Sequence, residues 1–204
     1  MLEEAFAIAS EAGQDDHAAR ALVNLAGSTV TRHRGDPRAA DHIESALRFV
    51  LDRGLDGYVH DTFGVRANLR LMGGDWPAAE ADARAALDLG EQHGVSRCPA
   101  LLALGRLRAR RGDPEAGATL DEAWRVALST RELQRIGPAG AARAEHAWLE
   151  GDLEAAAAAS RRWPPSTPWA RCGPRRACAG VCAPPACAAS RGARGPPRAR
   201  RPAG

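Results

Sequence analysis

The five cysteines are the residues of this chain best suited to chemistry, because a thiolate can act as a nucleophile or as a zinc ligand. Cys98 precedes Pro99 at an expected helix start, with no histidine in sequence register, which favours a structural thiol. The other four are separated by five, three and four residues, without the Cys-x-x-Cys spacing of a structural zinc site: Cys172, Cys178, Cys182 and Cys187. The cysteine pattern therefore predicts no metal centre.

The remaining reactive side chains do not complete a catalytic site either. The six histidines are dispersed and form no His-x-x-x-His pair. The adjacent acids Asp15-Asp16 and Asp121-Glu122 stand at expected helix starts, where carboxylates favour the helix dipole instead of facing each other for acid–base work. All 28 basic residues are arginine, which excludes a lysine-containing phosphate-binding loop and a Schiff-base lysine. We therefore expect no enzyme, no catalytic residue, no cofactor and no metal.

The basic charge is concentrated at the C-terminus. Residues 1–160 hold all 25 acidic groups and 18 arginines, whereas residues 161–204 hold ten arginines, no acid and nine of the 14 prolines. The net charge of +3 averages these two unlike parts. We predict a helical domain over residues 1–162 and a disordered tail over residues 163–204.

The tail has two interpretations. It is a disordered arm whose ten arginines contact nucleic-acid phosphates, or it is the product of a GC-rich gene read out of frame. The second is favoured by the abrupt loss of acids and by the dominance of Arg, Pro, Ala, Gly and Cys.

A Gly-Asp pair recurs four times, at residues 35–36, 74–75, 112–113 and 151–152, with intervals of 39, 38 and 39 residues. An alanine follows each Asp by three residues, and another follows the first three Asp by ten: Ala39, Ala78, Ala116, Ala155, Ala46, Ala85 and Ala123. The position seven after the Asp is Ile43, Asp82 or Leu120. These spacings predict one helical stripe with small residues at close helix contacts.

Each pair also predicts a helix boundary. The glycine ends one helix in a left-handed conformation, and the aspartate caps the next, with Pro37 and Pro114 at the first helical position. The repeating unit is thus a helical hairpin. We also expect a first helix over residues 2–12 ending at Gly13, second helices ending at Gly54 and Gly94, and a fourth leading helix over residues 139–149 that relies on Ala142, Trp148 and Leu149.

This hairpin resembles the tetratricopeptide repeat, whose pattern Ala116, Leu120 and Ala123 match fully. The resemblance covers residues 1–160 and implies an all-α stack of helical hairpins with partial first and last repeats. The stretch from Val95 to Pro114 is similar to the helical arm of actinobacterial LuxR-type, ATP-dependent (STAND-like) transcriptional regulators. That similarity implies a fragment of such a regulator, serving as a non-catalytic protein-interaction or sensor module that neither hydrolyses ATP nor binds an operator.

In the family pattern, side chains five residues before each Asp line the concave face and contact a protein or peptide partner. Here these are Thr31, Arg70, Arg108 and Ala147, joined by Asn24, twelve residues before the first Asp. Two arginines on adjacent repeats could clamp a peptide carboxylate. The alternative is that Arg70 and Arg108 are solvated surface cations.

The sequence gives no indication of a membrane. It holds no run of 18 apolar residues, and Met1-Leu2-Glu3-Glu4 begins acidic where a signal peptide would be basic. We expect a cytoplasmic protein whose repeat body does not bind nucleic acid.

Overall fold

The computed structural model describes residues 1–32, 36–89 and 91–161. Every element in this part of the chain is a helix, which confirms the all-α class for it. The predicted tail, residues 163–204, lies outside the described residues together with both of its interpretations.

The elements follow one another with short connections. In chain order they are α1 (Leu2–Glu11), α2 (Asp15–Arg32), α3 (Ala39–Asp52), α4 (Asp56–Met72), α5 (Trp76–Asp88), the 3-10 helix η1 (Glu91–Arg97), α6 (Cys98–Arg111), α7 (Ala116–Thr130), α8 (Leu133–Leu149) and α9 (Leu153–Arg161).

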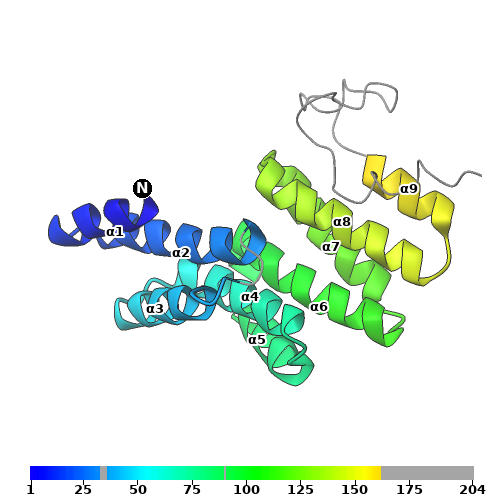
Figure 1. Ribbon diagram of the computed structural model, residues 1–204, viewed down its shortest axis with the longest axis horizontal. Coiled ribbons are helices and arrows are strands. Elements are labelled where there is room, and N and C mark those ends of the chain that lie inside the picture. Colours follow the sequence, from blue (N-terminus) through cyan, green and yellow to red (C-terminus); the bar gives the residue numbers. More distant parts are fainter. Residues whose placement is uncertain (33–35, 90, 162–204) are drawn as a thin grey trace, which may run out of the picture. The chain divides into compact units, whose positions relative to one another are not determined.

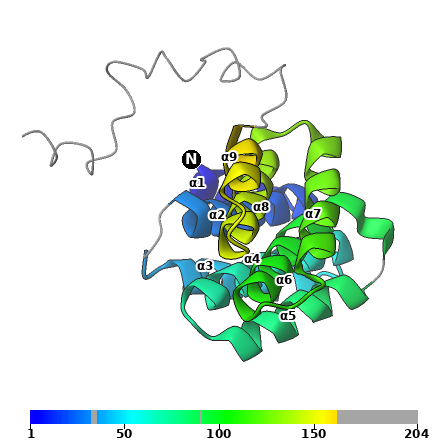
Figure 2. The same cartoon turned by 90° about the vertical axis from the view of Figure 1, so that its right-hand side faces the viewer.

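Helices that follow one another in sequence pack together (Figure 1). Each even-numbered helix also packs on the next even-numbered helix. Thus α2 contacts α4, α4 contacts α6, and α6 contacts α8. We call these four the even-helix layer. Helices α1, α3, α5, α7 and α9 lie against the even-numbered helices that flank them, as Figure 2 shows for α5 beside α4 and α6. The result is a repeat-like helical architecture.

The glycines of three Gly-Asp pairs have the predicted left-handed backbone: φ is +85° at Gly74, +69° at Gly112 and +81° at Gly151. Gly13 and Gly54 also have positive φ, at +66° and +63°. Because a side chain is strained in the left-handed backbone region, glycine is favoured where the chain leaves one helix and enters the next within a few residues.

The aspartates differ in how they begin the next helix. Asp75 accepts a hydrogen bond from the backbone N–H three residues later, at 3.2 Å, and is the N-cap of α5. Asp113 accepts one from the residue only two later, at 2.8 Å, and α7 begins at Ala116. Pro114 follows Asp113 directly and lies in the turn, not at the first helical position as predicted. Asp152 behaves like Asp75, and Asp36, followed by Pro37 in the turn, behaves like Asp113.

This difference shifts the buried stripe of α5 by one residue. The stripe predicted by counting from Asp is confirmed in α3 and α7, whose six positions are buried: Ala39, Ile43, Ala46, Ala116, Leu120 and Ala123. In α5 the prediction holds for Asp82, which is buried, and is wrong for Ala85, which is exposed. The buried alanines of α5 are Ala79, Ala83 and Ala86. Trp76 separates Asp75 from Pro77. The buried alanines of α5 therefore stand at the same distances from the proline as the stripes of α3 and α7 do, but one residue farther from the aspartate.

Two other predicted features differ from the structure. Gly94 does not end a helix: α5 stops at Asp88, and Gly94 lies within η1. Helix α8 begins at Leu133, before the predicted start at residue 139, and Trp148 and Leu149 are 63% and 43% exposed instead of buried.

Helices α4 and α6 approach each other closely at Gly64. A Cβ added there would lie 2.6 Å from the backbone nitrogen of Ala100 and 2.8 Å from Cβ of Pro99. Backbone atoms cannot move aside as a flexible side chain can, so this contact fixes the spacing of the two helices.

Gly64→Ala should therefore lower the free energy of unfolding by about 1–3 kcal/mol, because the added methyl group overpacks the α4–α6 contact. Urea denaturation followed by circular dichroism measures this. Gly57→Ala is the control in the same helix, since a Cβ there meets nothing within 4 Å. Equal effects of the two substitutions would show that the close approach is not a constraint.

The corrected register of α5 gives a second test. Ala86→Glu should lower the free energy of unfolding by at least about 3 kcal/mol, because it places an unpaired charge in the core. Ala85→Glu should change it by less than about 0.5 kcal/mol, because Ala85 is exposed. If Ala85→Glu lowered the melting temperature more than Ala86→Glu does, the buried stripe would be the one counted from Asp75.

Candidate functional site

The predicted contact residues lie on the even-helix layer. Asn24 is an exposed residue of α2, and Thr31 also belongs to α2, although its side chain lies outside the described part. Arg70 is in the last turn of α4, Arg108 is in the last turn of α6, and Ala147 is near the end of α8. Contact of a protein or peptide partner with these residues stays a prediction.

Arg70 and Arg108 are bonded within their own hairpins. Nη1 of Arg70 lies 2.8 Å from Oδ2 of Asp82 in α5. Nη2 of Arg108 lies 2.7 Å from Oε2 of Glu115, and its Nη1 donates to Oγ1 of Thr119 at 2.6 Å. The two-arginine clamp stays a prediction, and a peptide carboxylate would compete with these internal bonds.

Asp82 is the centre of an ion-pair network that the sequence did not reveal. It is 4% exposed and accepts two hydrogen bonds from Arg66, one from Nε and one from Nη2, each at 2.9 Å. Nη1 of Arg66 also donates to Glu44 at 3.0 Å. With Arg70, the network connects α3, α4 and α5. The sequence predicted a position on the helical stripe for Asp82, and its spacing from Asp75 gave no sign of its arginine partners.

Neighbouring even-numbered helices are also joined by a repeated side-chain link. Asn68 of α4 donates to the carbonyl oxygen of Pro99 in α6 at 2.7 Å, and Arg106 of α6 donates to that of Pro138 in α8 at 3.4 Å. The donors stand seven residues before Asp75 and Asp113, and the prolines stand fourteen before Asp113 and Asp152. These equal offsets were visible in the sequence and could have predicted the link.

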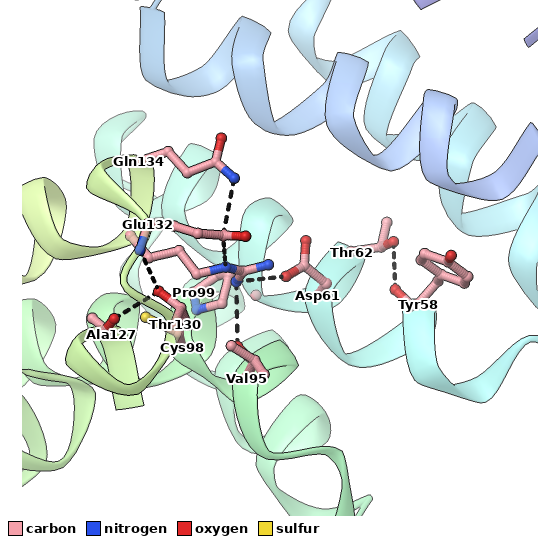
Figure 3. A network of polar contacts seen from close by, with 12 residues as sticks. Tyr58, Asp61, Thr62, Val95, Cys98, Pro99, Ala127, Thr130, Glu132 and Gln134 are labelled. Carbon is pink, nitrogen blue, oxygen red and sulfur yellow. Dashed lines mark hydrogen bonds and ion pairs between the residues drawn. The ribbon is translucent and has the colours of Figure 1, made fainter. Parts of the chain in front are cut away.

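A polar cluster lies where the N-terminal ends of α6 and α8 meet α4 (Figure 3). Nη1 of Arg135 in α8 lies 3.4 Å from Oδ1 of Asp61 in α4, and it donates to the carbonyl oxygen of Val95 at 3.3 Å. Nε of Arg135 donates to Glu132 at 3.2 Å. Pro99 has no N–H to offer the Val95 carbonyl four residues earlier, which leaves that oxygen available to Arg135.

Burial sets the direction of the pKa shift of two groups in the cluster, Asp61 and Cys98. It raises the pKa of Asp61, and the opposing effect of Arg135 is smaller. It also raises the pKa of Cys98 to about 11. The Cys98 thiol is therefore protonated at neutral pH and is a poor nucleophile, which favours the structural role expected for it.

The metal-ligating side chains of the described residues are dispersed. They contain no group of three or more His, Cys, Asp or Glu side chains that could hold a metal ion. His60 is 1% exposed, and its Nδ1 donates to the carbonyl oxygen of Ala86 at 2.9 Å, a packing role. Within the described ranges, no helix has the length and apolar character needed to cross a membrane.

Comparison with known proteins assigns no family. No family model matches the chain, and no curated protein or solved structure matches it.

The ion-pair network around Asp82 predicts a loss of stability when this carboxylate is removed. Asp82→Ala should lower the free energy of unfolding by about 1–3 kcal/mol, because the partly buried Arg66 and Arg70 both lose this carboxylate and Arg66 keeps only Glu44. Urea denaturation measures the change. The control is Glu80→Ala in the same helix, whose two partners, Arg84 and Arg111, are 56% and 40% exposed. About 1 kcal/mol or less is expected there, because ion pairs with exposed arginines contribute little. A loss at Asp82 no larger than at Glu80 would contradict the central role of Asp82.

Proposed function

We propose that this chain is a non-catalytic protein-interaction module built from tetratricopeptide-like helical hairpins. The observation that carries the proposal is the even-helix layer, in which α2, α4, α6 and α8 pack in series. In stacked-hairpin proteins such a layer forms an extended surface for a protein or peptide partner. The corrected register supports the likeness, since α3, α5 and α7 all bury their stripes at the same distances from a proline.

The charges of the layer favour a protein partner over nucleic acid. Residues 1–160 carry a net negative charge. Arginines of α4, α6 and α8 form ion pairs with carboxylates of the same body: Arg66 and Arg70 with Asp82, Arg106 and Arg110 with Glu145, Arg108 with Glu115, Arg111 with Glu80, Arg135 with Asp61, and Arg143 with Asp121. Binding of nucleic acid would require free cations that neutralise phosphates.

The link to LuxR-type regulators is part of the proposal. The stretch that carries this resemblance, from Val95 to Pro114, includes α6, whose residues from Ala100 to Gly105 are all buried. A buried helix of this kind supports kinship in fold and carries little information about a ligand. As the arm of such a regulator, the module would act in the cytoplasm.

A photo-crosslinking experiment tests the interaction surface. In an actinobacterial host, p-benzoylphenylalanine in place of exposed Asn24 of α2 should give a discrete covalent adduct with a partner protein, identified by mass spectrometry. The control carries p-benzoylphenylalanine in place of Ser45, which is exposed on α3 outside the even-helix layer. Identical adducts from both positions, or none from position 24, would contradict the proposal.

The same experiment separates the second candidate, nucleic-acid binding through the ten arginines of residues 161–204. Removing residues 163–204 should leave the position-24 adduct and the helical circular dichroism unchanged. If the full chain instead binds DNA or RNA in a salt-sensitive manner and the shortened chain does not, the basic tail is the functional segment.

A further inference from the structure

Helix α8 exposes a stripe of residues whose counterparts in α4 and α6 are buried. Counted back from the aspartate of the Gly-Asp pair that follows each helix, the stripe stands at fifteen, eleven, eight and four residues. In α8, Gly137 and Ala144 are half-buried, Ala141 is exposed and Trp148 is 63% exposed. In α4 and α6 all the counterparts are buried: His60, Gly64, Ala67, Leu71, Cys98, Leu102, Gly105 and Ala109.

On α4 this stripe is covered in large part by the next even-numbered helix, α6. The residues of α6 that meet it recur every three or four positions: Ala100, Ala103, Leu104 and Leu107. Leu107 packs with Leu71 of the stripe and with Trp76 at the start of α5. An even-numbered helix thus covers the one before it with two small and two large apolar residues.

Among the described residues, no helix takes the corresponding place on α8. Gly64 meets the backbone of α6, whereas its counterpart Ala141 borders a hollow of about 180 Å³. Trp148 and Leu153 are the counterparts of Leu71 and Trp76. They are 63% and 67% exposed, at the position where a residue equivalent to Leu107 would pack.

The charges beside this face are complementary to a basic helix. The charged residues from Trp148 to Ser160 are all acidic and exposed: Glu150, Asp152 and Glu154. Arg161, the next basic residue, is at the far end of α9. On α4, the covering helix α6 ends with Arg111, which lies 6.0 Å from the Trp76 ring and pairs with Glu80 of α5. A cation one turn after the Leu107 position would likewise meet the acids beside Trp148.

We propose that this open face of α8 and α9, formed by Gly137, Ala141, Ala144, Trp148 and Leu153, docks an amphipathic helix of a partner protein. The helix takes the place on α8 that α6 takes on α4. It carries small residues at the first two contact positions nearest its N-terminus, large apolar residues at the next two, and a basic residue one turn later.

The sequence of this chain favours another molecule as the source of that helix. Residues 164–204 hold nine prolines and no proline-free run longer than ten residues, whereas α6 has 14 residues. Proline interrupts a helix, so we expect the helix from a partner. Asn24 is not part of this face, and docking here does not require a partner on the even-helix layer.

A peptide with the sequence of α6 is the probe, because α6 covers the counterpart stripe of α4. It spans residues 97–112, carries Cys98→Ser and has a fluorescent label at its N-terminus. Fluorescence anisotropy measures its binding to the full chain. Trp148→Ser should raise the Kd by about tenfold or more by removing a large apolar contact, and Ala141→Arg should do so by blocking the close approach. Both positions are exposed, so both variants should keep the helical circular dichroism of the unaltered chain.

Two controls test whether the contact is specific. Leu51→Ser removes a large apolar residue that is 53% exposed on α3, and it should leave the Kd unchanged. A peptide with Glu in place of Arg108, Arg110 and Arg111 should bind about tenfold more weakly or less, because it meets acidic residues.

The partner-helix proposal is supported if binding is lost in Trp148→Ser and Ala141→Arg but kept in Leu51→Ser. It is overturned if the peptide does not bind at about 1 mM, or if it binds all three variants equally. Sedimentation of the full chain tests the other occupant: a dimer that disappears in Trp148→Ser would show that a second copy covers the face, and this too would overturn the proposal.

Discussion

The close approach of consecutive even-numbered helices is the constraint on which the rest of the structure depends. At Gly64 the backbone of α6 occupies the space that any side chain would need. This spacing allows a side chain as short as Asn68 to reach the carbonyl oxygen of Pro99 across the helix interface. Close backbone packing at this contact thus adds to the core clusters of larger side chains, such as the one around Ile43 and Leu47.

Small residues at the interfaces leave the polar network to fix the geometry within each hairpin. Arg66 and Arg70 converge on Asp82, so the pairing of α4 with α5 is specified by directional bonds as well as by apolar burial. Buried ion pairs contribute little net stability, but breaking one is expensive because a charge is left without a partner. In such ion pairs the arginines of the even-helix layer are already bonded to carboxylates of the same body. The surface of the layer is consequently less basic than its composition indicates.

The sequence predicted what is local and missed what depends on distant segments. The repeat period and the left-handed Gly74, Gly112 and Gly151 follow from short-range backbone chemistry. The stripe of α5 was misplaced because one inserted residue, Trp76, changes the distance between the cap and the helix core, and the Asp pattern alone does not reveal the insertion. The pairing of Asp61 with Arg135 spans 74 residues and two hairpins, and no spacing rule links them.

The described hairpins differ in how many neighbours cover them. In a stack whose stability comes from nearest-neighbour interfaces, a hairpin covered on one side opens more readily than one covered on both. Among the described elements, α8 and α9 form the last hairpin, and Leu153 of α9 is 67% exposed. Helix α9 packs on α8 alone, whereas α8 packs on α6, α7 and α9. Loosening of this end of the stack is therefore expected to begin at α9, the helix with the smaller packed interface.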